Sequence, residues 1–520
     1  MGAQSIDYVN NKKQFQLHTL ITEQSHPATS NLSETAKLDP ILATKMLLTV
    51  DHDINRKIAS LKNDKSTSAN INQAVMAVKN SLLTGNRVYI YGTGSTGRLA
   101  KQIENIWYTF WQKTKSRPDW PEIAKRLKDI PNLDNIQNLV IGEITGGDRA
   151  LIKSLEGFED LQLIGKLQLE DNHINASDVV FAVTEGGETS AVIGTILAAS
   201  KLPLTQKNNL YFVYNNPNKL LTPFDRSREI LTNSKITKIN FTTGNQAITG
   251  STRMQATTSQ TFLISTIIEQ ALAEVLHNKL SNSEFHKLGF NGNINIATRL
   301  NQFSQLQKDV EKQSPAITDV ANLEYQTYRA GNHAIYFGSQ LLTTLFIDVT
   351  ERAPTFNLSP LDAKGAQPLS WVTVYTEASN NNDGWYKLLG RDFRGLDKKR
   401  YNPTFESNIT DPYLKVTAIK SLDKAGYDQK YLYDLSVDNL KSNVIKPNDI
   451  GIAYLFVDEA NAILFAACKY IEDNKKRDRV AVIPLVIVSV FEALQTRSAN
   501  FAVADAILQK KTLSEYVNKL

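Results

Sequence analysis

A strand, a glycine-rich loop and a helix follow one another between residues 87 and 100, in the order Arg87-Val-Tyr-Ile-Tyr-Gly-Thr-Gly-Ser-Thr-Gly-Arg-Leu-Ala100. Apolar residues come first, glycines and hydroxyl residues fill 92–97, and apolar residues then recur at helical spacing. Glycines let a backbone turn sharply beside a ligand, and the free N–H groups that open a helix attract anions. The stretch therefore predicts a phosphate-binding loop between a buried strand and a helix.

This glycine loop fits neither of the common nucleotide-binding patterns. Its glycines match G-x-G-x-x-G, but a dinucleotide site also needs an acidic residue at the end of the next strand, about 20 residues on. Residues 113–121 do not read as a strand end, and the Gly-Lys-Ser/Thr ending of a nucleotide P-loop is missing. Consecutive hydroxyls suit the terminal phosphate of a sugar phosphate. The alternative is a tight turn without a ligand, which seldom needs three glycines and three hydroxyls together.

Composition limits the classes of function. A chain of 520 residues predicts two to four domains. The net charge of +5 arises from interspersed charges without a basic run, so nucleic-acid binding is not indicated. Cys468 is the single cysteine and no two of the seven histidines have ligand spacing, so we expect no disulfide and no metal site, nor any cofactor. The N-terminus lacks a signal-peptide pattern, and the apolar stretch Val480–Leu494 is short for a membrane span, so we expect a buried element there and a cytoplasmic protein without a membrane partner.

Strand-like and helix-like patterns alternate from about residue 85 to 290. This alternation predicts an α/β/α unit with a parallel sheet, in which ligands bind beyond the carboxyl ends of the strands. The predicted strands are Val88–Tyr91, Leu139–Ile144, Val179–Thr184, Leu210–Tyr214 and Lys238–Thr242, and the clearest helices are Ala191–Ala199 and Gln260–His277. We expect the glycine- and hydroxyl-rich loops that follow these strands to meet at one edge: 92–97, 145–148, 184–190 and 249–254.

A second, weaker copy of the unit follows. Residues 333–338 resemble the first glycine strand and 341–348 read as a helix, but the glycine-hydroxyl loop between them is lost. Further strands are predicted at 371–375 and 450–456, and residues 498–520 look like a small helical cap. The predicted division is a helical arm (1–60), a first unit with the phosphate loop (61–295), a second unit with a degenerate loop (296–478) and a C-terminal helical cap (479–520).

In this order of motifs the chain resembles the sugar isomerase (SIS) family, in the branch that holds the N-acetylmuramate 6-phosphate etherases and the glucokinase regulatory proteins. The resemblance rests on Ile21–Pro27, Val88–Arg98, Gly146–Asp148, Glu156–Asp160 and Gly250–Met254, five ordered motifs over about 235 residues. It implies two tandem SIS units with a flavodoxin-like fold. Tandem units are similar to the regulatory proteins, because the etherases carry a single unit and pair as dimers.

The resemblance also implies roles for the loops. Ser95 and Thr96 would hold the sugar phosphate, and Glu156 would contact the sugar, or act as an acid/base if the chain were an etherase. Surface positions for Glu156, Glu185 and Glu188, and a bridging role for Arg253, are the alternatives. The predicted phosphosugar-binding residues are Thr93, Gly94, Ser95, Thr96, Gly97, Arg98, Gly146, Gly147, Glu156, Thr184, Glu185, Gly187, Glu188, Thr189 and Arg253.

Four positions depart from the etherases. Glu185 and Glu188 stand where the etherases have alanine and arginine, which weakens anion binding unless these carboxylates point at sugar hydroxyls. Gln255 stands where the etherases usually have lysine, which also weakens anion binding. The second catalytic glutamate of the etherases falls on Ile106 here. Glu104 lies about 200° round the predicted helix from that position and is expected to face away.

The second unit carries a stretch that resembles the missing catalytic segment. It reads Asp348-Val-Thr-Glu351-Arg-Ala-Pro-Thr355, so Glu351 could reach the first site if the units pack like an etherase dimer, or could pair structurally with Arg352. Two functions remain. One is a non-catalytic sensor of a hexose or amino-sugar 6-phosphate that controls a sugar kinase. The other is an etherase-type lyase using Glu156 and Glu351, with a sugar-phosphate isomerase as a further alternative.

Overall fold

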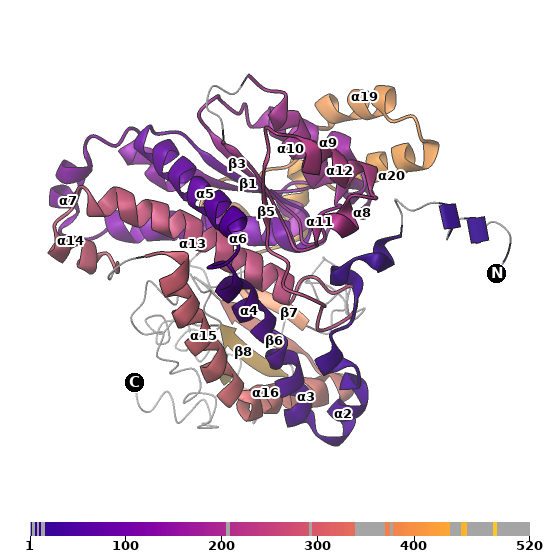
Figure 1. The fold of residues 1–520 in the computed structure, drawn as a ribbon. Coiled ribbons are helices and arrows are strands. Elements are labelled where there is room, and N and C mark those ends of the chain that lie inside the picture. Colours follow the sequence, from indigo (N-terminus) through magenta and orange to yellow (C-terminus); the bar gives the residue numbers. More distant parts are fainter. Residues whose placement is uncertain are drawn as a thin grey trace.

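The part of the chain that the structure describes contains two parallel sheets, seen in the computed structural model (Figure 1). The first has five strands in the order β2-β1-β3-β4-β5 and the second has four in the order β7-β6-β8-β9. The structure describes residues 2, 6–7, 10–11, 16–203, 208–290, 294–338, 370–374, 378–436, 449–454 and 482–485.

The first sheet matches the strands predicted between residues 85 and 290 to within a few residues at each end. Every neighbouring pair is parallel, and all five residues of each of the first four strands are buried. A sheet buried on both faces needs continuous apolar strands, which is what the sequence supplies. The strands are β1 (Val88–Gly92), β2 (Val140–Ile144), β3 (Val179–Val183), β4 (Leu210–Tyr214) and β5 (Thr237–Asn240).

Helices cover both faces of this sheet and make a three-layer unit. Side chains alternate along each strand, so Val88 and Ile90 pack with one set of helices and Tyr89 and Tyr91 with the other. The first set is α5 (Lys65–Leu83), α6 (Ser95–Lys115) and α13 (Gln255–His277), and the second is α9 (Gln162–Asp171), α10 (Ser190–Ser200) and α12 (Asp225–Thr232). Short helices fill the connections: α7 (Trp120–Leu127), η5 (Leu133–Asn138), η6 (Asp148–Leu151), α8 (Glu156–Glu159), α11 (Asn218–Leu221) and α14 (Asn282–Lys287).

The second sheet consists of β6 (Ala334–Gly338), β7 (Ser370–Val374), β8 (Ile450–Tyr454) and β9 (Val482–Leu485), and all its pairs are parallel. The range predicted for the helical cap, 479–520, therefore begins with a strand, because the apolar residues 482–485 pair with β8. The remainder of that range, the predicted helix 341–348 and Glu351 lie outside the described residues.

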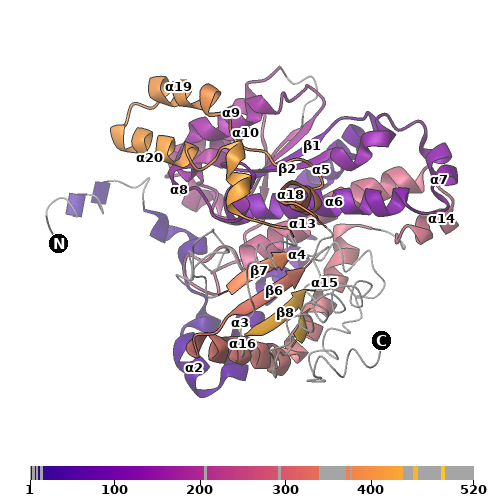
Figure 2. The same ribbon diagram turned by 180° about the vertical axis from the view of Figure 1, so that it is seen from behind.

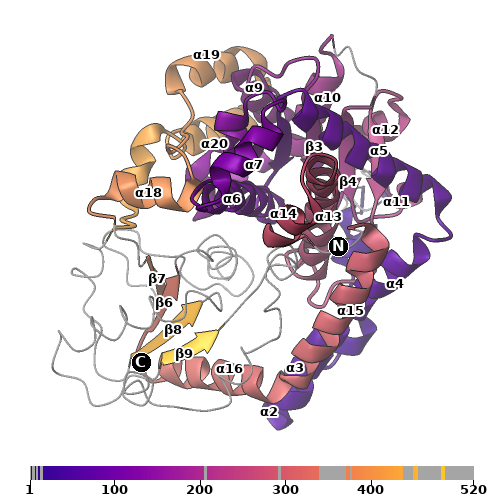
Figure 3. The ribbon, with the colours of Figure 1, turned by 90° about the vertical axis from the view of Figure 1, so that its left-hand side faces the viewer.

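The N-terminal arm packs against the helices that lead into the second sheet. Helix α3 lies on α16 and α4 lies on α15 (Figure 3). A buried ion pair between Arg299 of α15 and Glu269 of α13, with Nε 2.9 Å from Oε2, ties this layer to the first unit. The elements are η2 (Leu17–Thr19), η3 (Ile21–Glu23), η4 (Pro27–Thr29), α2 (Leu32–Leu38), α3 (Pro40–Thr49), α4 (His52–Ser60), α15 (Ile296–Lys312) and α16 (Ser314–Arg329).

Residues 381–436 pack on both units. Trp385, Leu388 and Tyr433 share an apolar cluster with Tyr336 and Ile452 of the second sheet. The later helices of this segment, drawn in orange beside α8, α9 and α10 in Figures 1 and 2, pack against the first unit. Here Leu396, Tyr401 and Phe405 share one apolar cluster with Leu155 and Phe158. We call residues 381–436 the crossing segment. It contains α18 (Asn381–Leu389), α19 (Lys398–Asn408), α20 (Pro412–Leu422) and η7 (Tyr427–Leu432).

The described residues contain neither a membrane-spanning helix nor a group of metal-binding side chains. None of their helices combines the length and the apolar character that crossing a bilayer requires. Nor do three or more of their histidine, cysteine, aspartate or glutamate side chains gather as metal ligands would.

Candidate functional site

The topology places the candidate site beside β1. Strand β1 lies between β2 and β3, so the chain moves from β1 to one side and then returns to the other. Ligands in open parallel sheets bind at such a switch point, beyond the carboxyl ends of the strands. The loops after β1, β2 and β3 all leave from this edge, as the sequence predicts.

Three glycines shape the loop between β1 and α6, for two different reasons. A Cβ on Gly92 would lie 2.3 Å from the Thr96 carbonyl carbon and one on Gly97 would lie 2.4 Å from Ile144 Cγ1, so both allow the helix to approach the sheet. Gly94 has φ +55° and ψ −120°, a conformation that other residues rarely adopt. A Cβ there would meet only Ser154 Oγ, at 3.8 Å. The space beside Gly94 is therefore open where a ligand would meet the first turn of α6.

The hydroxyls of this loop have different roles. Thr96 Oγ1 accepts from the Thr93 N–H at 3.0 Å and donates to the Thr93 carbonyl at 2.9 Å, so it closes the loop on itself. Thr93 Oγ1 lies 2.6 Å from Thr145 Oγ1 of the neighbouring loop. Within the described part of the chain, the Ser95 hydroxyl has no hydrogen-bond partner. Of the three, Ser95 is the one whose hydroxyl is available to a ligand.

Arg98 lies behind the loop with 2% of its surface exposed. Its Nε donates to the Leu151 carbonyl at 2.8 Å and Nη2 to the Ala150 carbonyl at 3.2 Å, which fixes η6 against α6. Burial, assisted by the nearby charge of Arg253, lowers its pKa to about 9, while Glu156 and Glu185 act in the opposite direction. Arg98 thus places a positive charge beside the loop and is balanced by site carboxylates.

Gly146 and Gly147 shape the loop after β2, both with positive φ (96° and 78°). The Gly146 N–H donates to Gln168 Oε1 at 3.0 Å. A Cβ on Gly147 would lie 2.8 Å from the Arg394 carbonyl oxygen. The absence of a side chain at Gly147 therefore allows the backbone of the crossing segment to pack closely against this loop. A sugar contact at either glycine stays a prediction.

A buried ion network lies between α6, β2 and the crossing segment. Asp148 lies 3.1 Å from Lys101 Nζ and 2.7 Å from Arg391 Nη1, and Glu104 lies 3.0 Å from Arg391 Nε. Arg394 pairs with Glu143. Burial raises the pKa of Glu104 to about 7 and also raises that of Asp148, against the opposing effect of Lys101.

This network decides the position of Glu104. Its carboxylate is held by Lys101 and Arg391, and Ile106, two residues on, is buried. The Glu104 carboxylate is therefore engaged inside the protein, and its orientation away from a bound sugar stays a prediction.

The loop after β3 adds two hydroxyls and two carboxylates. Thr184 Oγ1 lies 3.0 Å from Thr189 Oγ1 and accepts from the Gly187 N–H at 3.2 Å, so these three residues form a closed turn. Glu185 is 8% exposed and accepts a hydrogen bond from Thr257 Oγ1 at 3.0 Å. Glu188 folds back over Gly186, and its buried Oε2 has no hydrogen-bond partner among the described residues.

The carboxylates of α8 and of the loop after β3 act on one another. Burial raises the pKa values of Glu159, Glu185 and Glu188 to about 7, and at Glu159 the charges of Glu156 and Asp160 add to the effect. Glu156 itself opens α8 and is exposed. The structure thus brings Glu156, Glu185 and Glu188 within electrostatic reach of one another, through Glu159.

Arg253 places a positive charge near the carboxylates of Glu156, Glu159 and Glu185. Burial lowers its pKa, while Glu185, Glu156 and Glu159 raise it. Arg253 therefore joins Arg98, Glu156 and Glu185 in one group of charges, contributed by four separate loops and helices.

The sequence prediction omitted Glu23 from the site. The motif Ile21–Pro27 runs along the 245–249 loop, where the His26 N–H donates to the Gln246 carbonyl at 2.7 Å. Glu23 Oε2 would lie 3.3 Å from a Cβ on Gly250. At Glu188, burial raises the pKa most, Arg226 lowers it, and the charge of Glu23 raises it further. The sequence signal that could have indicated Glu23 is the motif Ile21–Pro27, from which no site residue was predicted.

Gln255, which stands for a family lysine, holds the same 245–249 loop from inside. Its Oε1 accepts from the Ala247 N–H at 3.0 Å and its Nε2 donates to the Asn245 carbonyl. With 1% of its surface exposed, it supports the loop and presents no charge to a ligand.

Comparison with known proteins gives the same branch that the motifs indicate. The chain is 26% identical over 258 residues to an N-acetylmuramic acid 6-phosphate etherase from Aliivibrio fischeri, covering 49% of this chain and 70% of the relative. A Francisella tularensis etherase is 25% identical over 259 residues, covering 50% and 73%. The etherases are relatives of this chain. Their match confirms the resemblance stated from the motifs.

Two other comparisons add little. No family model matches the chain. A solved structure, the C-terminal domain of glucosamine-fructose-6-phosphate aminotransferase from Francisella tularensis, aligns with 88% of this chain and 94% of its own at a TM-score of 0.35 and 11% identity. The fold assignment stands on the strand order and the parallel pairing.

Proposed function

We propose that the first unit binds a sugar phosphate, a hexose 6-phosphate or an amino-sugar 6-phosphate, and reports its occupancy to a partner without converting it. The observation that carries the proposal is the open corner at Gly94. A Cβ there would meet only Ser154 Oγ, at 3.8 Å, beside the first turn of α6 and the available Ser95 hydroxyl, and Arg98 adds a buried positive charge behind the loop. Backbone N–H groups at a helix start together with a guanidinium suit a phosphate.

The environment of α6 supports sensing over turnover. Elimination of lactate from a sugar needs a base for the C2 proton and an acid for the ether oxygen. On α6 the position of the second etherase glutamate is Ile106, and Glu104 is engaged by Lys101 and Arg391. A sugar kinase is the partner implied by the resemblance to the glucokinase regulatory proteins.

A second candidate function, an etherase-type lyase on a 6-phosphorylated amino sugar, has its own support. The curated relatives are etherases by name, and Glu156 lies in the same group of charges as Glu185. Two carboxylates of different pKa can divide acid and base roles. In this candidate Glu156 would work with Glu351.

One experiment separates the two. Purified protein is mixed with N-acetylmuramate 6-phosphate and the lactate methyl signal is followed by NMR, while thermal shifts are recorded with the same compound, glucose 6-phosphate and fructose 6-phosphate. The sensor predicts a raised melting temperature without lactate, and the same shift in Glu351→Gln. The lyase predicts lactate that disappears in Glu156→Gln. A failure of all three compounds to stabilise the protein would overturn both candidates.

A further inference from the structure

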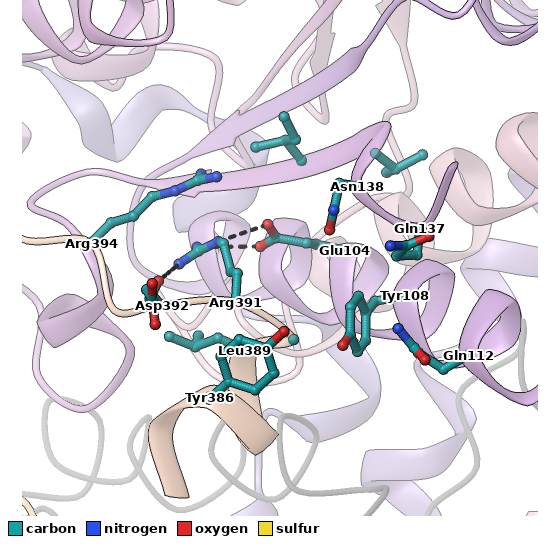
Figure 4. Close-up of a pocket in the computed structure, with 13 residues that line it drawn as sticks. Glu104, Tyr108, Gln112, Gln137, Asn138, Tyr386, Leu389, Arg391, Asp392 and Arg394 are labelled. Carbon is teal, nitrogen blue, oxygen red and sulfur yellow. Dashed lines mark hydrogen bonds and ion pairs between the residues drawn. The ribbon is translucent and has the colours of Figure 1, made fainter. Parts of the chain in front are cut away.

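A cavity of about 280 Å³ lies between α6 and the crossing segment (Figure 4). On α6 it is lined by Glu104, Tyr108 and Gln112, and no residue of the glycine loop at the start of that helix lines it. Its walls come from the middle of α6, from η5 and the start of β2, and from the end of α18 with the residues that follow it. Neither of the two functions considered for the first unit uses it. We propose that this cavity is a second binding site, for an uncharged monosaccharide.

The polar groups of the cavity suit hydroxyls. Gln112, Gln137 and Asn138 present carboxamides, and Tyr108 and Tyr386 present phenols (Figure 4). Each of these groups can both donate and accept, as a sugar hydroxyl does. Asn138 lines the cavity and is exposed, and its side chain has no hydrogen-bond partner among the described residues. Val140, Ile141 and Leu389 add an apolar surface for the C–H face of a sugar ring.

Both arginines of the cavity are paired with carboxylates, and the exposed Asp392 adds a further carboxylate to the lining, which disfavours an anionic ligand. Arg391 is engaged by Glu104 and Asp148, and Arg394 by Glu143. An anion would have to compete with these carboxylates, and a cation would meet the guanidinium groups. The site therefore differs in kind from the glycine loop, which is built for a phosphate.

The shape favours a sugar over a flat heteroaromatic ring. A Cβ on Gly390 would lie 2.6 Å from Cγ and Cδ1 of Tyr108, so one face of the Tyr108 ring is covered by the backbone at the end of α18. Burial, followed by the contact with the Tyr386 hydroxyl, raises the Tyr108 pKa to about 12, in keeping with close packing of the two phenols. A volume of about 280 Å³ is at the lower limit of ligand pockets and holds a single ring.

The test measures binding of glucose and of N-acetylglucosamine to the full chain by saturation-transfer NMR and calorimetry. We expect one of them to bind with a dissociation constant of about 1 mM or tighter. Binding should weaken about 10-fold or more in Asn138→Leu, which replaces a hydrogen-bonding group by an apolar one. Asn63→Leu, an exposed asparagine outside the cavity, should leave binding unchanged.

Three results would overturn the proposal: no binding of either sugar at 50 mM, equal binding to Asn138→Leu and the parent protein, or loss of the signal when a bound sugar phosphate fills the first site. Tyr386→Phe gives a second check, because it removes only a hydroxyl and is expected to weaken binding; binding equal to that of the parent protein would also count against the proposal. The test does not depend on the proposed function, since a chain that ignores every sugar phosphate could still bind glucose here.

Discussion

Arg391 holds Asp148 with two hydrogen bonds across 243 positions of sequence, Nη1 lying 2.7 Å from Oδ2 and Nη2 lying 3.0 Å from Oδ1. The same guanidinium contacts Glu104 on α6 through Nε, at 3.0 Å. Asp148 itself directly follows Gly146 and Gly147 in the loop after β2. One side chain of the crossing segment therefore fixes a site loop and the helix that begins at the phosphate loop.

Replacing Arg391 by methionine should be strongly destabilising. It would leave Asp148 and Glu104 buried with Lys101 as their remaining ion-pair partner and Arg394 nearby, and breaking such a pair costs about 3–5 kcal/mol. Urea unfolding of the variant and the parent measures the difference. Lys398→Met, which removes the exposed pair with Asp423, is the control and should change stability little. Equal effects of the two substitutions would contradict the importance given to the network.

Two glycines of one loop should respond differently to alanine. Gly94→Ala meets open space and imposes only backbone strain, about 1–3 kcal/mol, while its new methyl group enters the proposed phosphate position. We expect a folded protein that no longer gains thermal stability from a sugar phosphate. Gly97→Ala places its Cβ 2.4 Å from Ile144, so we expect a loss of folded protein. Circular dichroism and thermal shifts with glucose 6-phosphate distinguish these outcomes, and an unaltered ligand shift in Gly94→Ala would argue against the site.

Neighbouring hydroxyls provide a similar contrast. Ser95→Ala removes a hydroxyl without a described protein partner and should weaken sugar-phosphate binding about 10-fold while leaving the melting temperature unchanged. Thr96→Val removes the group that bonds to both the N–H and the carbonyl of Thr93, so its main effect should be a lower melting temperature, from a loss of about 1–3 kcal/mol. Calorimetry and thermal unfolding of both variants check this. The reverse pattern would assign the ligand contact to Thr96.

Stability should fall as the pH rises through 7, through the site glutamates. The pKa of Glu188 is raised by burial to about 7, from an ordinary value near 4.5. The folded state therefore holds protons that the unfolded state has released, and the stability present below about pH 4.5 is lost as the pH approaches 7. Glu188→Gln should make the free energy of unfolding less dependent on pH between 5.5 and 7.5. Glu34→Gln, on an exposed side chain, is the control. Parallel pH profiles for the parent and Glu188→Gln would contradict the assigned pKa.

The strands and the glycine loop could be predicted because their signals are local. Buried parallel strands are continuous apolar runs, and the prediction placed Val179–Thr184 where the strand is Val179–Val183. The same holds for the helix after the glycine loop, which apolar residues at helical spacing predict: Trp107 and Trp111 recur on one face of α6 and are 1% and 0% exposed. Periodicity alone is sufficient for such features.

Contacts between distant segments could not be predicted in this way. Nothing around Arg391 indicates that its partners lie on α6 and after β2, because pairing depends on the path of the crossing segment. The distinct roles of Ser95 and Thr96 also depend on the loop conformation, since both are hydroxyls in one motif. Likewise the sequence of Val482–Leu485 indicates only a short apolar run, and its pairing with β8 as a strand is known from the structure.

The crossing segment also limits how the chain can be divided for expression. A fragment that ended at residue 295, the boundary read from the sequence, would present Leu155, Phe158 and Leu161 to water, because their covering residues lie at 396–425. It would also retain Glu143 and Asp148 without their arginines. The later half of the chain thus supplies part of the earlier half's interior, and residue 295 is not a place to cut.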